Sequence, residues 1–158
     1  MENETRTVEY SLTETVHSLR PTDINGYGRL FGGQLMQWID EMAGIVARRH
    51  SSGQVTTASV DNLVFKKGAY INQILVMIGR VTYVGRTSME IRVDTYVEDE
   101  HGTRAMINHA YVVMVSIDKD GRALSVPGLD VRTESERAEW EGGKRRYALR
   151  KERRKEGY

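Results

Sequence analysis

The chain has 158 residues, of which 39% are hydrophobic and 28% charged, the usage of a single globular domain large enough to bury its own core. It has no cysteine, which excludes disulfides, thiolate metal sites and a cysteine nucleophile, so any catalysis must use oxygen or nitrogen groups. The net charge of +1 conceals an asymmetry: residues 1–131 carry −3 (13 basic and 16 acidic residues), and residues 132–158 carry +4 (10 basic and 6 acidic residues).

The sequence contains no membrane signal. No apolar run approaches the roughly 20 residues of a membrane-spanning helix. The first ten residues include Glu2, Glu4 and Arg6 in place of an apolar signal core. We therefore expect a cytoplasmic protein with no membrane partner.

The first half of the chain predicts a strand and a long helix. Apolar residues alternate with polar ones over residues 7–18, which predicts a strand with one buried face. The glycine-rich turn Asn25–Gly28 follows, and a helical period of apolar residues predicts a helix over about residues 31–50. Its apolar stripe is wider than that of a surface helix, so we expect other structure to enclose it.

The second half is rich in β-forming residues. Four strands are predicted, at 55–65, 71–84, 88–97 and 105–117. Their short connections favour an antiparallel sheet, and the single apolar helix before them indicates an α+β fold in which the sheet wraps around that helix. We expect one domain over residues 1–131 and a charged helical tail over residues 132–158.

The tail is predicted to be a polar helix. Thr133 or Ser135 could cap it, and its acidic residues precede its basic ones, which matches the helix dipole. We interpret it as a solvated terminal helix. A basic patch for phosphate groups or nucleic acid is the alternative, but no aromatic-interleaved recognition motif favours nucleic acid as a partner.

The helix over residues 31–50 carries the candidate chemistry. Gly32 and Gly33 open it, and free amides at a helix N-terminus could stabilise the oxyanion that forms when water attacks a carbonyl. Tight packing against the sheet would also explain these glycines. Asp40 lies among apolar residues, where burial would suit a carboxyl to acid–base chemistry. The alternative is an exposed acid that forms a polar strip with Glu41.

Asn25 is the second polar candidate. It precedes the helix by a loop, whereas Asp40 lies about two turns and roughly 10 Å beyond Gly33. If Asn25 and Asp40 act together, this separation favours a site shared across a subunit interface.

The segment from Asn25 to Asp40 closely resembles the signature of hotdog-fold acyl-CoA thioesterases, the bacterial YciA/YkhA-like acyl-CoA hydrolase group. Together with three further matches, the resemblance covers about residues 7–130. The matching motifs are Asn25-x-x-Gly28-x-x-Phe31-Gly32-Gly33-x-Leu35-Met36-x-Trp38-x-Asp40, Ala58-Ser59-Val60-Asp61 leading to Phe65, Tyr83-Val84-Gly85-Arg86-Thr87-Ser88-Met89, and Asp120-Gly121-Arg122 with Val126-Pro127.

The resemblance implies a hotdog fold, with the sheet around the helix, and protomers that pair as dimers and commonly assemble into hexamers. It implies hydrolysis of acyl-CoA to a fatty acid and CoA without a metal or organic cofactor. Asp40 would be the general base toward water, or the nucleophile. Asn25 of the neighbouring subunit would orient the thioester or water, and the region of Gly32 and Gly33 would hold the carbonyl oxygen.

The phosphates of CoA require a cationic rim. Arg86 is the first candidate, Lys66 and Lys67 come next, and Thr87 and Ser88 could donate hydroxyl groups. A plain turn with solvent-facing strand positions is the alternative. The two lysines also mark a departure from the family pattern, which often has a proline after the position of Phe65. The four histidines have no metal-ligand spacing, so no metal site is expected.

Two other functions compete with hydrolysis. A non-catalytic acyl-CoA-binding or regulatory hotdog protein would bind the same ligand without cleaving it. A hotdog dehydratase or hydratase is disfavoured because this helix has no histidine before position 50. Acyl chain length is not predicted, because it depends on how Trp38, Met36, Tyr27 and the interface loops close the acyl tunnel.

Overall fold

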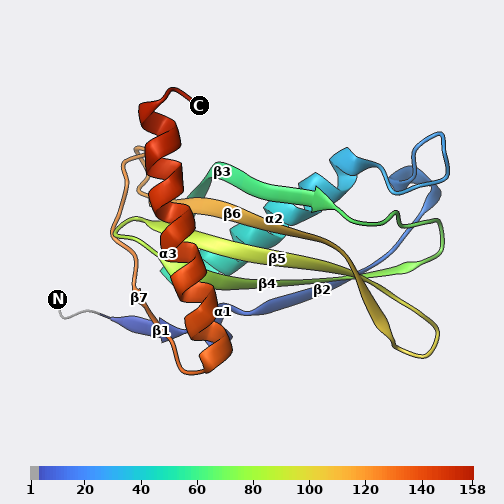
Figure 1. Cartoon of the computed structure of the whole chain (residues 1–158), viewed down its shortest axis with the longest axis horizontal. Coiled ribbons are helices and arrows are strands. Elements are labelled where there is room, and N and C mark those ends of the chain that lie inside the picture. Colours follow the sequence, from blue (N-terminus) through green and yellow to red (C-terminus); the bar gives the residue numbers. More distant parts are fainter. Residues whose placement is uncertain (1–3) are drawn as a thin grey trace.

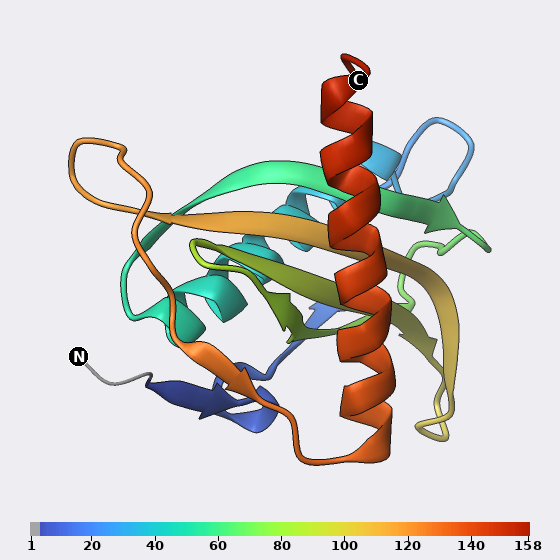
Figure 2. The ribbon, with the colours of Figure 1, turned by 60° about the vertical axis from the view of Figure 1, so that its left-hand side comes forward.

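The computed structural model describes residues 4–158, except for the side chain of Asn62. Two long helices lie on opposite faces of a five-stranded sheet, α2 on one face and α3 on the other (Figures 1 and 2). The elements, in chain order, are β1 (Thr5–Thr7), α1 (Val8–Ser11), β2 (Thr13–Ser18), a 3₁₀ turn (Pro21–Asp23), α2 (Gly32–Ser51), β3 (Gln54–Phe65), β4 (Ile74–Val84), β5 (Ser88–Glu98), β6 (Arg104–Ile117), β7 (Gly128–Asp130) and α3 (Glu134–Lys155).

The sheet has the strand order β2-β4-β5-β6-β3, and every neighbouring pair is antiparallel. The four strands predicted after the helix and the antiparallel sheet are therefore confirmed. β3 follows α2 directly but pairs with β6, so it forms one edge of the sheet. This edge position brings β3 alongside α2, where the candidate site lies.

The hydrophobic core lies between α2 and the sheet. Leu35, Ile39, Met42 and Val46 recur along one face of α2 and are at most 2% exposed. They pack with the inward side chains of the central strands, such as Met77, Ile91, Val112 and Met114. The predicted enclosed helix is confirmed, and its bounds differ from the predicted ones by one residue at each end.

The N-terminal strand predicted over residues 7–18 is only partly correct. Thr7 caps a short helix, α1, and its Oγ1 accepts a hydrogen bond from the Tyr10 amide at 3.1 Å. Val8 and Ser11, three residues apart, are buried, whereas Tyr10 and Leu12 are exposed. The apolar alternation therefore misled the prediction, and the long strand begins at Thr13.

The prediction of a solvated C-terminal helix is wrong. Thr133 caps α3 through a capping box with Glu136, as the sequence allowed. The helix then crosses the outer face of the sheet, where Gly142, Gly143 and Arg150 are buried. Tyr83 of β4 contacts the rings of Trp140 and Tyr147, with centroids 4.6 and 5.5 Å apart.

Among the described residues, no helix is long and apolar enough to span a membrane.

Candidate active site

Asp40 lies on the side of α2 that faces the edge strand β3. The hydroxyl of Thr57, on β3, donates a hydrogen bond to Asp40 Oδ1 at 2.6 Å. Asp40 is exposed in the single chain, so the expected burial of this carboxyl is wrong. Successive residues of an α-helix are rotated by about 100° around the helix axis. The step from buried Ile39 to Asp40 therefore carries the carboxyl out of the core and onto the open side of the helix.

The Asp40–Thr57 pair lies in a surface groove between α2 and β3. The groove has a volume of about 430 Å³. Its lining combines the two polar partners and a second acid with a glycine, apolar side chains and one cation: Asp40, Glu41, Gly44, Ile45, Arg48, Val55, Thr57 and Met114. A carboxylate held by one hydroxyl, with its other oxygen free of protein donors among the described residues, can accept a proton from water.

In the single chain, the side chain of Asn25 stabilises its own loop. Its Oδ1 accepts hydrogen bonds from the amides of Tyr27 and Arg29 at 2.9 and 3.2 Å. Gly28 completes the turn with a φ of 75°, in the left-handed region. Asn25 does not line the Asp40 groove, and no hydrogen bond joins Asn25 to Asp40 within residues 4–158. One chain therefore does not bring the two together, and their meeting across an interface stays a prediction.

The N-terminus of α2 is open. The first intrahelical bonds are those from the amides of Gln34 and Leu35 to the Phe31 carbonyl, at 3.0 and 3.2 Å. Among the residues described, the amides of Gly32 and Gly33 have no acceptor, and Phe31 provides no side-chain cap. A Cβ on Gly33 would lie 2.6 Å from Cε1 of the exposed Phe31 ring, which would have to move, whereas a Cβ on Gly32 would make only an ordinary contact with Phe65 at 3.8 Å. Packing against the sheet therefore does not require either glycine, and the role of their amides at an oxyanion stays a prediction.

The candidate CoA-binding residues separate into two groups. Thr87 and Ser88 line a pocket of about 390 Å³ between α3 and the outer face of the sheet. Arg86 is exposed in the adjoining turn, whereas Lys66 and Lys67 are exposed beyond the end of β3 and do not line this pocket. The other lining residues are Ala58, Ser59, Asp61, Val113, Val115, Tyr147, Arg150, Arg153, Arg154 and Tyr158.

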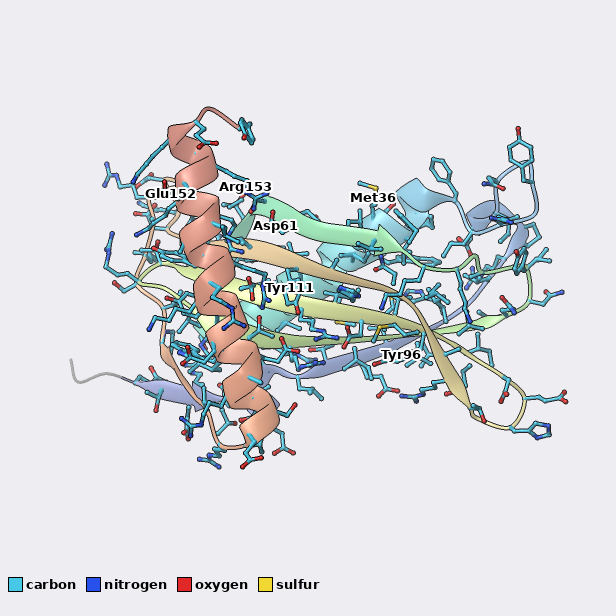
Figure 3. The ribbon with its side chains drawn as sticks, viewed as in Figure 1. Met36, Asp61, Tyr96, Tyr111, Glu152 and Arg153 are labelled. Carbon is cyan, nitrogen blue, oxygen red and sulfur yellow. The ribbon has the colours of Figure 1, made fainter. Side chains whose placement is uncertain are left out.

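Two acids of the sheet hold the arginines of α3 in place. Asp61 of β3 accepts hydrogen bonds from Arg150 and Arg153 at 3.2 and 2.9 Å, and Figure 3 shows Asp61 beside Arg153. Glu90 of β5, only 1% exposed, accepts hydrogen bonds from Arg150 at 2.9 Å and from Nε and Nη2 of Arg146 at 3.0 and 2.8 Å. Burial alone would raise the pKa of Glu90. The hydrogen bonds from Arg146, Thr82 and Arg150, with the charge of Arg146, outweigh burial and lower that pKa.

Sequence reasoning missed two parts of the site. Thr57 had no signal, because its approach to Asp40 depends on β3 lying at the sheet edge beside α2. The α3 arginines did have one: Arg146, Arg150 and Arg153 recur at i, i+4 and i+7, which places them on one helix face. No group of three or more metal-ligating side chains occurs in the described part of the chain.

Residues 27–103 match the family model of the thioesterase superfamily. The cytosolic acyl coenzyme A thioester hydrolase of Homo sapiens is 37% identical over 147 residues, which are 91% of this chain and 39% of that protein. The chain thus spans about two fifths of the length of the mammalian relatives it matches. The acyl-CoA thioester hydrolase YkhA of Bacillus subtilis, itself uncharacterized, is 35% identical over 136 residues, covering 84% of this chain and 78% of YkhA.

Solved structures are similar over nearly the whole chain. The acyl-CoA hydrolase of Staphylococcus aureus, in complex with butyryl coenzyme A, coenzyme A and coenzyme A disulfide, superposes with a TM-score of 0.91 at 31% identity, covering 96% of this chain and 93% of that one. A hexameric acyl-CoA thioesterase, solved in the apo form, gives a TM-score of 0.91 at 34% identity, covering 95% and 97%. Alanine variants of the S. aureus enzyme have been solved for one asparagine, one aspartate and one threonine, successively 15 and 17 residues apart.

Proposed function

This chain belongs to the thioesterase superfamily and has its hotdog fold, and we propose that it is an enzyme that hydrolyses acyl-CoA to a fatty acid and free CoA. The family named from the Asn25–Asp40 motif is confirmed. Relatives at 35 and 37% identity are named acyl-CoA thioester hydrolases, which supports the activity. The observation that carries the proposal is the Asp40–Thr57 hydrogen bond at the groove.

In the proposed mechanism Asp40 is the general base. The Thr57 hydroxyl holds one carboxylate oxygen, and the other takes a proton from water as the water oxygen attacks the thioester carbonyl. The resulting oxyanion is stabilised by helix N-terminal amides, those of Gly32 and Gly33. When the C–S bond breaks, the CoA thiolate leaves and takes the proton back from Asp40. Each step uses groups of the protein and water, without a metal or organic cofactor.

The amides and Asn25 that complete this site would come from a neighbouring subunit. Gly33 and Asp40 are seven residues apart on one helix, about 10 Å, which is too far for both to contact one carbonyl. The edge of the sheet offers the contact surface: Val60, Val64 and Phe65 of β3 are 45–51% exposed. Unpaired, apolar strand edges favour pairing with a second chain.

We therefore propose a homodimer with shared sites, able to assemble further into hexamers. Two similar solved structures are described as hexameric: the acyl-CoA thioesterase that is 34% identical to this chain and the thioesterase y2039 of Yersinia pestis. Asn25, Asp40 and Thr57 are separated by 15 and 17 residues, the same separations as those of the substituted asparagine, aspartate and threonine of the S. aureus enzyme. This agreement supports all three as one functional set.

The phosphate-bearing end of CoA is assigned to the pocket between α3 and the sheet. Thr87 and Ser88 supply hydroxyl donors, and Arg153 and Arg154 supply charge; Arg154 has no carboxylate partner among the described residues. Arg86, in the next turn, extends this rim. Lys66 and Lys67 lie elsewhere in the chain, and their contact with CoA stays a prediction. The mammalian relatives are named cytosolic, which supports a cytoplasmic location for this chain.

Release of free thiol from acyl-CoA by the purified protein tests the activity. We expect Asp40→Asn to lower kcat by about 10²- to 10⁴-fold, the usual contribution of a general base. Thr57→Val should lower kcat by about tenfold, because the carboxylate loses a charge-assisted hydrogen bond, and Thr57→Ser should restore it. Glu141→Gln, an exposed acid on α3, is the matched control and should leave kcat unchanged.

Two outcomes would contradict the proposal. If the wild type binds acyl-CoA but releases no thiol, the chain is the non-catalytic binding protein considered as the alternative. The shared site is tested separately by subunit exchange between Asp40→Asn and Asn25→Ala. Because one of the two sites in each mixed dimer keeps both wild-type residues, the mixture should regain activity that neither variant has alone. A mixture as inactive as its parents would show that Asn25 and Asp40 do not act across an interface.

A further inference from the structure

Asp40, Gly44 and Arg48 form a row along the open face of α2. They are spaced at i, i+4 and i+8, so they follow one another on the same side of the helix. All three line the groove that holds the Asp40–Thr57 pair. The row therefore joins the candidate base to a cation about 12 Å farther along the helix axis.

No packing contact within the chain explains why a glycine occupies position 44. A glycine inside a helix costs about 1 kcal/mol relative to alanine, so a tight contact usually explains it. A Cβ built on Gly44 would meet no atom within 4 Å. The glycine instead leaves the floor of the groove open between Asp40 and Arg48.

The groove continues past Arg48 toward the end of α2. A second hollow, of about 830 Å³, shares Ile45, Arg48 and Val55 with the Asp40 groove. The rest of its lining consists of Arg49, Ser52, Gly53, Gln54 and Ile117. The two hollows therefore form one open channel that begins at Asp40 and passes Arg48. Its lining combines polar and charged residues with the apolar side chains of Ile45, Val55, Met114 and Ile117.

Arg48 is available at the far end. Within the described part of the chain it makes no ion pair and no side-chain hydrogen bond. The C-terminus of α2 is already capped, because the Arg6 guanidinium donates to the carbonyls of Arg49 and His50 at 3.1 and 2.6 Å. Arg49 is engaged as well, since it donates to Thr13 Oγ1 at 2.9 Å.

We propose that this channel receives the acyl group of the substrate and that Arg48 binds a carboxylate at the far end of that group. This inference rests on the proposed thioesterase function, and it names the substrate class as acyl-CoA esters of dicarboxylic acids. Asp40 and Glu41 at the near end repel a second carboxylate, whereas Arg48 attracts it. The acyl group is thereby oriented with its thioester at Asp40.

The test compares dicarboxylic and monocarboxylic substrates of equal length. Thiol release is measured with adipyl-CoA against hexanoyl-CoA and with suberyl-CoA against octanoyl-CoA. In the wild type we expect a higher kcat/KM for the dicarboxylic member of at least one pair. Arg48→Gln should lower that preference by up to about fivefold, as expected for the loss of a solvent-exposed charge pair. Arg145→Gln, an exposed arginine of α3 outside both hollows, is the control and should keep it.

A second substitution tests the path of the acyl group. Gly44→Leu fills the floor of the channel, so kcat/KM should fall more for the suberyl than for the adipyl ester. Equal losses for both would overturn the assigned path.

The results also separate the two proposals. If no acyl-CoA is hydrolysed by the wild type, the thioesterase function itself fails. If hydrolysis occurs but Arg48→Gln changes both members of each pair equally, the carboxylate site is wrong. If that equal change disappears with acyl-pantetheine esters, which lack the CoA nucleotide, Arg48 binds a CoA phosphate instead, and the proposal is likewise overturned.

Discussion

Replacing Glu90 by glutamine is expected to loosen α3 from the sheet. The glutamine keeps the shape of the side chain and removes its charge. Glu90 accepts hydrogen bonds from Arg146 at 2.8 and 3.0 Å, from Arg150 at 2.9 Å and from Thr82 at 2.7 Å. The Arg146 and Arg150 side chains are only 18% and 9% exposed, so both would lose an anion in a poorly solvated place.

Breaking a buried ion pair costs about 3–5 kcal/mol when one charge is left alone. Arg150 keeps Asp61 at 3.2 Å and Arg146 keeps Glu139 at 3.9 Å, so we expect a cost at or just below the lower limit of this range, about 2–3 kcal/mol. For a chain of this size, that corresponds to a fall in Tm of about 5–10 °C. Urea and thermal unfolding followed by circular dichroism measure both quantities. The matched control is Glu98→Gln, which removes an exposed ion pair to Arg104 and should cost below about 1 kcal/mol.

The pH dependence gives this prediction a second check. The pKa of Glu90 is lowered in the folded state, so its contribution is present above the unfolded pKa of about 4.3 and is lost as the pH falls through the folded value. The stability difference between wild type and Glu90→Gln should be constant above about pH 5 and shrink below about pH 4. If Glu90→Gln unfolds at the same urea concentration as Glu98→Gln at neutral pH, the buried network does not hold α3 and the reasoning fails.

Two further predictions concern the fold. His50 is fully buried, and burial lowers its pKa despite its hydrogen bond with the Pro127 carbonyl. Stability should therefore be full above about pH 6.5, the unfolded pKa, and decline as the pH falls from there through the folded pKa. In urea unfolding, His50→Gln should flatten this dependence of the midpoint on pH, whereas the exposed control His101→Gln should not. Gly143→Ala would place a Cβ 2.5 Å from Tyr83 Cβ and should lower the free energy of unfolding by about 1–3 kcal/mol. The control is Gly142→Ala, whose Cβ would meet only the flexible end of the Arg146 side chain. Equal Tm values for the two variants would contradict the close contact between α3 and the sheet.

Local patterns predicted most of the secondary structure. The apolar period of the helix and the β-rich segments after Gly53 depend on residues a few positions apart, so they can be recognised without tertiary contacts. The prediction failed at residues 8–11, where the cap by Thr7 turned the chain into a helix although the apolar alternation favoured a strand. The helix α3 was predicted correctly, but its packing on the sheet was not, because the partners of its arginines lie on β3 and β5, far away in the sequence.

The candidate site divides in the same way. Asp40, Asn25 and the two glycines could be singled out because they share one short motif. Thr57 could not, because 17 residues separate it from Asp40 and only the edge position of β3 brings the two within 2.6 Å. Thr87 and Ser88 could be singled out together because they are adjacent in the sequence, but the arginines that line the same pocket come from α3, whose packing on the sheet no local pattern predicts.

The sequence by itself determined the long helices, most of the strands, the family and the position of Asp40 on its helix, since these depend on residue spacing and on one contiguous motif. The tertiary structure decided that Asp40 is exposed at a groove, that Thr57 is its partner and that α3 forms one wall of the second pocket. The physical reason is that strand order and register set contacts between distant residues. Strand order and register depend on how the whole chain packs, and no local period in the sequence encodes them.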